Sequence, residues 1–459
     1  MSLPEAVSDR VTIRNRSQLA GQGQEDLRSV ALEIAEAGLR AADPRAAVER
    51  AVARSGDKIT VADRAYTLSD YDRVLVLGAG KASLEVLRGL ESVFGDVLSD
   101  GVVVVRRSQS TETGSCVEIL EGDHPLPTAA SVEGANRLVE IARTAGARDL
   151  ILGCFTGGSS ALACLPPAGV TLQEKRELHR LLLSSGAPIN EINAVRKHVS
   201  AFKGGRLAAT APHSTFINLT VCDVVGCDHD LLTDPTVPDA STVAQAIAVL
   251  RKYRLWDEVA TSIRRHLQTG QAAESPTLDQ RIQTEVIVTA RAASLAMAER
   301  AIELGRRAFP LGSVEGEARA SGHDLARRIR QSLRGTGPFP RGSAVIACGG
   351  ESTVSLAPGA TRFGAGGPNQ ELVLGAALEL KGEAAAILSI DTDGSDGGGR
   401  FAGGMADGQT AQRASDLGLD VEAMLEEHSS SEALRALGDL VDTGPTGTNV
   451  NDLVVMVFD

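Results

Sequence analysis

A lysine beside closely spaced glycines is the arrangement in this sequence best suited to binding an anion. Gly78-Ala79-Gly80-Lys81 directly follows an apolar run, Arg73–Leu77, and precedes an amphipathic helical pattern. A lysine at a helix N-terminus adds a cation where the helix dipole is already positive, which is favourable when an anion lies between them. The stretch therefore predicts an anion site that includes Gly78, Gly80 and Lys81.

The same glycines match part of a dinucleotide-binding fingerprint. Ser83 replaces its third glycine, and Arg106 and Arg107 stand where an acidic residue would contact the ribose of NAD. A basic pair at that point suits a 2′-phosphate, so an NADP-dependent enzyme is an alternative.

A second loop that combines glycines with hydroxyls is Thr156–Ser160, which follows the apolar run 149–154. Glycine lets the backbone approach a ligand closely, and serine adds hydroxyl donors that suit a carboxylate or a phosphate. The structural alternative is a serine N-cap of the next helix. The candidate binding residues are Gly157, Gly158, Ser159 and Ser160.

A third such loop lies near the C-terminus, where Gly438–Asp452 precedes the apolar run 453–458. Its turn is rich in hydroxyls and backbone donors that suit phosphate or sugar-acid oxygens. A surface hairpin turn is the alternative. The candidates are Thr446, Gly447, Thr448 and Asn449.

Cationic side chains gather between residues 190 and 206. Read as one helix, the segment places Arg196, Lys197 and Lys203 on one side, and Gly204-Gly205 ends it. A solvated helix face is the ordinary interpretation of such a stripe. As part of a site, Arg196 would be catalytic and Lys197 would bind a ligand anion.

Carboxylates also follow several of the apolar runs. They are Asp223 after 216–221, Asp393 and Asp396 after 385–390, and Glu351 after 344–348. Carboxylates beyond strand ends hold Mg²⁺ between protein and phosphate oxygens. We expect Asp223 to be catalytic, the Asp393/Asp396 pair to hold Mg²⁺ and Glu351 to bind substrate or nucleotide. Turn chemistry is the alternative for Asp393 and Asp396.

The elements that must position these residues are β-branched apolar runs that alternate with helical stretches. This pattern predicts an α/β protein with parallel sheets covered by helices on both faces. Because 459 residues are too many for a single core, two domains are expected. We expect a frayed segment over 1–24 and domains over 25–334 and 335–459, with the Gly/Pro-rich segment 335–342 at the boundary.

Composition excludes some partners. The net charge of −13 leaves no basic surplus for nucleic acid. No apolar run is long enough for a membrane span and no leader peptide is evident, so a cytoplasmic protein is expected. Six cysteines without a CxxC pair predict reduced thiols rather than a zinc site.

Taken in order, the motifs of residues 25–459 resemble those of the class II glycerate 2-kinases, whose C-terminal part is called the MOFRL domain. The motifs are VLGAGKAS, GDHPLPT, TGGSSALACLP, SGAPINEINAVRKHVSAFKGGRLA, DPTVPD, CGGESTV, GGPNQEL, DTDGSDG and TGPTGTNVNDL. The resemblance implies a Rossmann-like N-terminal domain, a smaller α/β C-terminal domain and an active site between them. It also implies phosphorylation of D-glycerate to 2-phosphoglycerate, dependent on ATP and Mg²⁺.

Carried over by position, the resemblance makes Lys81 and Asp223 active-site residues and places Asn369 and Gln370 at a ligand. The chain departs from the family where Pro368 replaces an arginine, where Thr233-Asp234 replaces Ser-Gly, and where Cys227 replaces an acidic residue. An arginine is a planar bidentate cation, so its loss from a phosphate site is not conservative. We expect Arg362 or Arg400 to serve the lost role, or the acceptor to carry less negative charge than glycerate.

The expected partner is a small hydroxy acid, with neither nucleic acid nor a membrane as a partner and a homodimer as a candidate assembly. Two alternatives stay open. One is an NADP-dependent hydroxypyruvate reductase, and the other is a divergent relative that acts on or binds another sugar acid.

Overall fold

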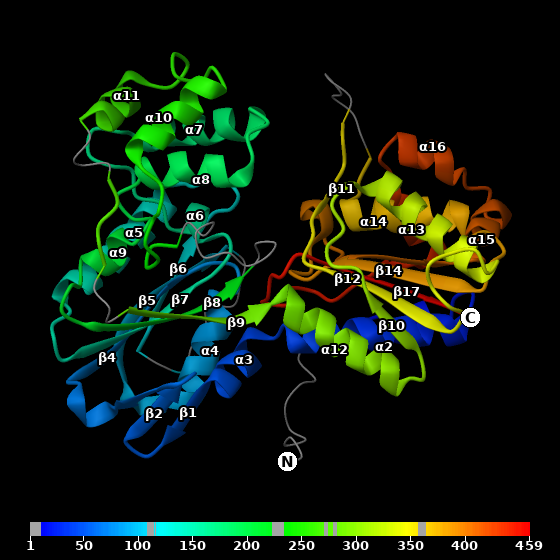
Figure 1. Ribbon diagram of the computed structural model, residues 1–459, viewed down its shortest axis with the longest axis horizontal. Coiled ribbons are helices and arrows are strands. Elements are labelled where there is room, and N and C mark those ends of the chain that lie inside the picture. Colours follow the sequence, from blue (N-terminus) through cyan, green and yellow to red (C-terminus); the bar gives the residue numbers. More distant parts are fainter. Residues whose placement is uncertain are drawn as a thin grey trace. The chain divides into compact units, whose positions relative to one another are not determined.

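The chain folds into two compact units. The computed structural model describes residues 11–107, 114, 116–222, 234–269, 274–278, 282–356 and 364–459. Pro44–Ile287 form one unit, here called the central unit, and Met1–Asp43 with Val288–Asp459 form the other, called the terminal unit (Figure 1).

The central unit is built on a six-stranded sheet with the order β6-β5-β4-β7-β8-β9. Its strands are β6 (Glu118–Gly122), β5 (Leu98–Arg106), β4 (Arg73–Ala79), β7 (Asp149–Phe155), β8 (Thr215–Cys222) and β9 (Ile282–Thr289). The pairs from β6 through β8 are parallel. The apolar runs therefore predicted this sheet correctly, since strands covered on both faces need apolar residues throughout.

Helices cover both faces of this sheet. α4 (Ser83–Phe94) and α3 (Pro44–Ala51) lie on one face, and α5 (Ala129–Thr144) and α9 (Arg206–Ala209) on the other (Figure 1). A short antiparallel sheet joins β1 (Val52–Ser55), β2 (Lys58–Val61) and β3 (Arg64–Thr67). A separate apolar core unites α7 (Leu172–Ser184), α8 (Ile189–His198), α10 (Val243–Lys252) and α11 (Thr261–Gln268).

The terminal unit has a mixed sheet with the order β10-β12-β17-β14-β15-β16. Its strands are β10 (Arg307–Pro310), β12 (Ser343–Cys348), β17 (Asp452–Phe458), β14 (Ala385–Asp391), β15 (Gly403–Asp407) and β16 (Leu440–Val441), with β11 (Gly316–Glu317) pairing β13 (Ser352–Thr353) apart from it. The expectation of a parallel sheet is wrong here, because β17 lies antiparallel between β12 and β14. The predicted α/β class with a second, smaller sheet domain is confirmed.

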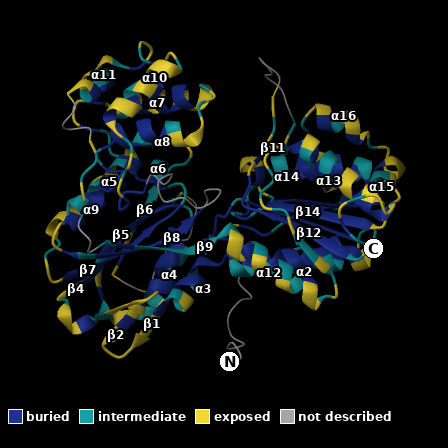
Figure 2. Cartoon of the chain, in the orientation of Figure 1, coloured by how far each residue is buried: buried dark blue, intermediate teal, exposed yellow. Residues whose placement is uncertain are grey.

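Helices of the terminal unit also cover two faces of their sheet. α2 (Glu25–Ala41) and α12 (Ala290–Glu303) pack on one, and α14 (Pro368–Glu379), backed by α13 (Ala318–Leu333), packs on the other (Figure 1). α15 (Thr410–Asp416), α16 (Val421–Glu426) and α17 (Ser430–Leu437) complete that second layer. The strands between the layers are buried almost throughout (Figure 2).

The N-terminal segment is part of this packing rather than frayed. α1 (Arg16–Ala20) forms, and Val11, Ile13 and Leu19 are buried. The expectation of disorder over 1–24 is therefore wrong from residue 11 onward. Segment 335–342, expected at a domain boundary, connects α13 to β12 within the terminal unit.

No helix in the described ranges is long and apolar enough to span a membrane. Cys154, Cys164 and Cys348 are buried free thiols, as predicted, and Cys116 is an exposed one. The prediction of reduced thiols is wrong for Cys222 at the end of β8, which is disulfide-bonded.

Candidate functional site

The loop between β7 and α6 (Ser159–Leu162) offers backbone donors to a ligand. It follows a strand in the middle of the central sheet, at the carboxyl end where open α/β sheets bind ligands. Gly158 has a φ of +83°, a conformation that favours glycine. Among the described residues, the half-buried N–H groups of Gly157 and Gly158 find no acceptor, so they can donate to an anion.

The Gly78–Lys81 loop packs directly against this loop. The N–H of Lys81 donates to the carbonyl oxygen of Gly157 at 2.8 Å, and the N–H of Gly80 donates to Val104 at 3.2 Å. The N–H of Ala82 donates to the hydroxyl of Thr156 at 3.1 Å. The bonds from Lys81 and Ala82 hold the two loops together, the bond from Gly80 reaches β5, and Gly78 lies in β4 paired with a strand on either side. The geometry therefore does not support an anion bound by the backbone of Gly78 and Gly80. The Gly78–Lys81 loop contributes the Lys81 side chain to the candidate site.

Lys81 and His124 both lie beside Gly158. A Cβ built on Gly158 would be 3.1 Å from Cγ of Lys81 and 3.3 Å from Cδ2 of His124. His124 was not singled out from the sequence, although GDHPLPT follows β6 at the same edge of the parallel sheet. The three residues form the centre of the candidate site.

Gly158→Ala is expected to lower kcat/KM by about tenfold or more, because the new methyl group displaces Lys81 or His124 and small misplacements are costly. Its positive φ adds about 1–2 kcal/mol of destabilisation. Gly186→Ala is the matched control, since Gly186 has a φ of +72° and no atom within 4 Å of its built Cβ. Steady-state kinetics and thermal unfolding of both variants check this, and equal activity in the two would contradict it.

Ser160 connects the loop to a buried lysine. The ammonium of Lys203 donates to the Ser160 hydroxyl, and Lys203 is only 1% exposed. Ser159 is buried and is the first residue of α6, but the N-cap of this helix is Gly158 and no side chain caps it, so the alternative of a serine N-cap is wrong. The sequence pattern gave Lys203 no site role, because it placed this lysine on the same helix as Arg196 and Lys197.

The segment 190–206 is not one helix. α8 ends at His198, and the Ser200 hydroxyl accepts the N–H groups of Phe202 and Lys203 at 3.1 Å, which turns the chain away from the helix. Gly205 precedes α9 instead of ending α8. The predicted stripe is therefore broken between Lys197 and Lys203.

Lys197 and Arg196 differ in their surroundings. Lys197 is buried and pairs with Asp239 at 2.7 Å, so its charge is neutralised inside the unit and the geometry does not support a ligand role. Arg196 is half-buried, and one of its Nη atoms donates to Asn193 at 3.3 Å. Its Nε has no partner among the described residues. Arg196 stays a candidate.

In the terminal unit, Asp396 secures the start of α14. Its carboxylate accepts the N–H groups of Asn369 and Gln370, each at 3.0 Å, and is 1% exposed. The Asn369 amide bridges Asp396 and Asp452, and the Gln370 amide oxygen accepts from Ser431. These contacts contradict a metal role for Asp396 and commit Asn369 and Gln370 to internal bonds. Burial raises the pKa of Asp396 to about 6 and that of Asp452 to about 7.

The hydroxyls of the 446–449 loop are also used internally. Thr446 donates to the carbonyl of Thr392, and Thr448 donates to that of Ala42 at 2.6 Å. Thr446, Thr448 and Asn449 are buried, and Gly447 is half-buried with a φ of +75°. The loop is packed structure, so the hydroxyl contacts with a ligand predicted from the sequence find no support.

The remaining residues predicted for the site lie on the surface, in a turn or outside the described residues. Glu351 is exposed, and Asp393 accepts the N–H of Ser395 at 2.9 Å. The described residues contain no group of three metal-ligating side chains. Asp223, Cys227, Thr233 and Arg362 lie outside the described residues.

The departures from the family pattern have structural roles where they are described. Pro368 is the first residue of α14, a position that suits its fixed φ. Asp234 is buried and accepts from Asn218 and Thr236, which fixes the adjacent turn. Arg400 is 82% exposed and 3.9 Å from Asp442, so its position gives no support for the role of the missing arginine.

Several of the groups that favoured NADP binding are engaged in contacts within the protein. The backbone donors of the Gly78–Lys81 turn are already bonded, as described above. Arg107 pairs with Asp123 at 3.1 Å and Glu121 at 3.6 Å, and these contacts compete with a 2′-phosphate.

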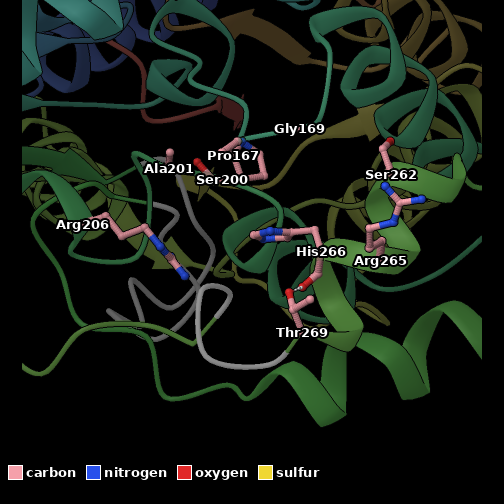
Figure 3. Close-up of a pocket in the computed structure, with 10 residues that line it drawn as sticks. Pro167, Gly169, Ser200, Ala201, Arg206, Ser262, Arg265, His266 and Thr269 are labelled. Atoms are coloured by element: carbon pink, nitrogen blue, oxygen red, sulfur yellow. Dashed lines mark hydrogen bonds between the residues drawn. The ribbon is translucent and has the colours of Figure 1, made fainter.

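A cavity of about 460 Å³ lies elsewhere in the central unit, lined by Pro167, Gly169, Ser200, Arg206, Arg265 and His266 among others (Figure 3). Arg206 donates to the carbonyls of Lys197, Lys203 and Glu274, and Nε2 of His266 donates to the carbonyl of His198 at 3.0 Å. These two side chains hold segments of the unit together, so the cavity is not preferred as the site.

Two family models match this chain. Residues 30–268 match the family model described as a domain of unknown function (DUF4147), and residues 344–452 match that of the MOFRL family. The glycerate 2-kinase of Pyrococcus horikoshii is 36% identical over 438 residues, which cover 94% of this chain and 97% of that protein.

Two further relatives bear on the activity. A protein of Agrobacterium vitis, named provisionally as a hydroxypyruvate reductase, is 40% identical over 386 residues, covering 83% of this chain and 86% of that protein. The crystal structure of glycerate kinase from Thermotoga maritima matches with a TM-score of 0.81 and 33% identity, covering 95% of this chain and all of that one. The chain belongs to the glycerate 2-kinase family that carries a C-terminal MOFRL domain.

Proposed function

We propose that this protein is a glycerate 2-kinase, which transfers the terminal phosphoryl group of ATP to the 2-hydroxyl of D-glycerate. The observation that carries the proposal is the convergence of Lys81 and two unpaired glycine N–H groups at the carboxyl end of a parallel sheet, in a chain that belongs to this family. Catalysis of phosphoryl transfer depends mainly on positioning and on stabilising charge, and this arrangement can do both.

The residues have distinct proposed roles. Lys81 neutralises charge on the transferring phosphoryl group, and the N–H groups of Gly157 and Gly158 donate to its oxygens. Arg196 supplies further positive charge in the same unit. Asp223 is proposed as the residue that orients the acceptor hydroxyl.

We also propose that ATP acts as its Mg²⁺ complex, as is general for phosphoryl transfer from ATP. The carboxylates described in the terminal unit do not fit a metal site, because Asp396 is committed to α14. Mg²⁺ bound mainly by phosphates and water needs as few as one protein carboxylate. We further propose a cytoplasmic protein, with a homodimer as a candidate assembly.

The test is purified protein with ATP, Mg²⁺ and a panel of short 2-hydroxy acids, followed by ADP release and by phosphorus NMR of the product. D-Glycerate should give the fastest release and a 2-phosphate, and chelation of Mg²⁺ should abolish turnover. NADPH with hydroxypyruvate is run in parallel. NADPH oxidation, together with ADP release that no hydroxy acid changes, would replace the kinase with the reductase suggested by the name of the Agrobacterium relative.

A further inference from the structure

Three cationic side chains gather beneath the β7–α6 loop. Lys175 of α7 and Lys203 are almost fully buried, and Arg196 of α8 lies close enough to affect the pKa of both. Lys175 donates to the carbonyl of Val199 at the end of α8, and Lys203 donates to the Ser160 hydroxyl. An ammonium has three donors, so each lysine here has used only one.

The described part of the chain offers this cluster no carboxylate. No described residue forms an ion pair with Lys175, Arg196 or Lys203, and the Cys164 thiol faces all three. His179 of α7 faces the cluster with an unpartnered Nε2. The contrast with Lys197 is direct, because that buried lysine of the same segment does have its carboxylate, Asp239.

Buried cations without a counter-ion are costly. Burial lowers the pKa of Lys175 to about 8 and that of Lys203 well below its ordinary value, and Arg196 adds to both effects. Burial together with Arg196, Lys175 and Lys203 also lowers the pKa of His179. An anion bound among these groups would remove the cost and restore the charge on the lysines.

We propose that Lys203, supported by Arg196 and Lys175, binds an oxyanion of a substrate beside Ser160. The ligand chemistry is a carboxylate or a phosphoryl group, supplied either by the hydroxy acid or by the nucleotide. The identity of these substrates rests on the proposed function. Lys203 contacts Ser160 and Lys81 lies beside Gly158, so an anion at this loop would be held by two lysines from separate segments.

Lys203→Met tests the proposal, with Lys58→Met as the matched control because Lys58 is an exposed lysine of the same unit. Calorimetric titration with D-glycerate, inorganic phosphate and ATP is run on the wild type and both variants. Lys203→Met should weaken binding of at least one of these by about tenfold or more, while Lys58→Met binds as the wild type does. Selective loss of glycerate binding identifies the carboxylate, and loss of ATP and phosphate binding identifies the phosphoryl group.

Thermal unfolding separates binding from scaffolding. The ligand-free Lys203→Met variant should melt at the wild-type temperature or above, because methionine replaces a buried polar amine with an apolar side chain of similar size. Wild-type binding of all three ligands by Lys203→Met would overturn the proposal. Because binding is measured without turnover, an absence of kinase activity would defeat the proposed function and leave this result intact.

A wild-type measurement keeps the proposal testable if the variant does not fold. The groups that face the site are Lys175 and His179 of α7, Arg196 of α8, Arg206 of α9 and Cys164. At a pH near 9, between about 8 for Lys175 and the usual lysine value of about 10.4, binding of an anion should take up protons. Calorimetry in buffers of different ionisation enthalpy detects this, and binding without proton uptake would contradict the proposal.

Discussion

Replacing Lys81 with alanine is expected to lower kcat/KM for phosphorylation of D-glycerate by roughly 10²-fold or more, equivalent to about 2.7 kcal/mol of transition-state stabilisation. The side chain is half-buried and lies against Gly158, whose N–H group is one of the donors in the candidate site. A cation fixed at that point acts on charge that develops during transfer. The effect should therefore appear in kcat more than in the KM for glycerate.

Two controls separate this role from a structural one. Lys58→Ala removes an exposed lysine from the same unit and should leave kcat/KM unchanged. The Lys81 backbone bond to Gly157 survives in Lys81→Ala, so its unfolding free energy should change by less than about 1 kcal/mol. Wild-type kcat/KM in a folded Lys81→Ala protein would place the lysine in the scaffold and move the site elsewhere.

The sequence was most informative about the central sheet and the loops at its carboxyl edge. Runs such as Leu150–Cys154 carry no charged residue and are bounded by Gly-rich loops, which favours a strand covered on both faces. The strand direction then places the following glycines at one edge. The N–H groups of Gly157 and Gly158 have no acceptor in the part of the chain that the structure describes, as the glycine-rich sequence suggested.

The terminal sheet shows what a local pattern cannot specify. The run 453–458 is as apolar as its neighbours, yet it enters the sheet antiparallel between β12 and β14. Strand direction here depends on a pairing across more than 60 residues of sequence, and periodicity carries no information about that. The hydroxyls of the loop before β17 likewise looked available until their partners, the carbonyls of Thr392 and Ala42, were known.

Side-chain partners also decided which cations can serve a site. Arg196, Lys197 and Lys203 appear equivalent in the sequence. Their environments differ because Asp239, distant in the chain, reaches Lys197, whereas the Ser200 hydroxyl ends the helical path and directs Lys203 toward Ser160. A serine that competes with the helix is visible in the sequence, but the fold determines whether it does so.

The largest effect on stability is expected for a substitution near the N-terminus, at Arg28. Arg28 of α2 is fully buried and pairs with Asp439 at 2.9 Å and with Asp407. Arg28→Met should destabilise the terminal unit by about 3–5 kcal/mol, because it leaves buried carboxylates without their cation. Arg16→Met is the matched control. Arg16 pairs with Glu33 at 3.3 Å while 41% exposed, and such surface pairs contribute about 0–1 kcal/mol.

The pH dependence of the stability that Arg28→Met loses identifies the cause of that loss. Burial disfavours the charge of Asp407, yet Arg28 holds its pKa below the ordinary value in the wild type. A carboxylate with a lowered pKa contributes stability above its unfolded pKa and loses it as the pH falls. Without Arg28, burial is opposed mainly by the N–H groups of Gln24 and Gln409, so the pKa of Asp407 rises and the variant loses less stability than the wild type as the pH falls. Chemical denaturation of both variants between about pH 7 and pH 4.5 should therefore show the Arg28→Met deficit shrinking toward acid, since the unfolded aspartate titrates near 3.9. A deficit that is constant with pH would mean that Arg28 stabilises the unit through packing of its side chain rather than through its charge.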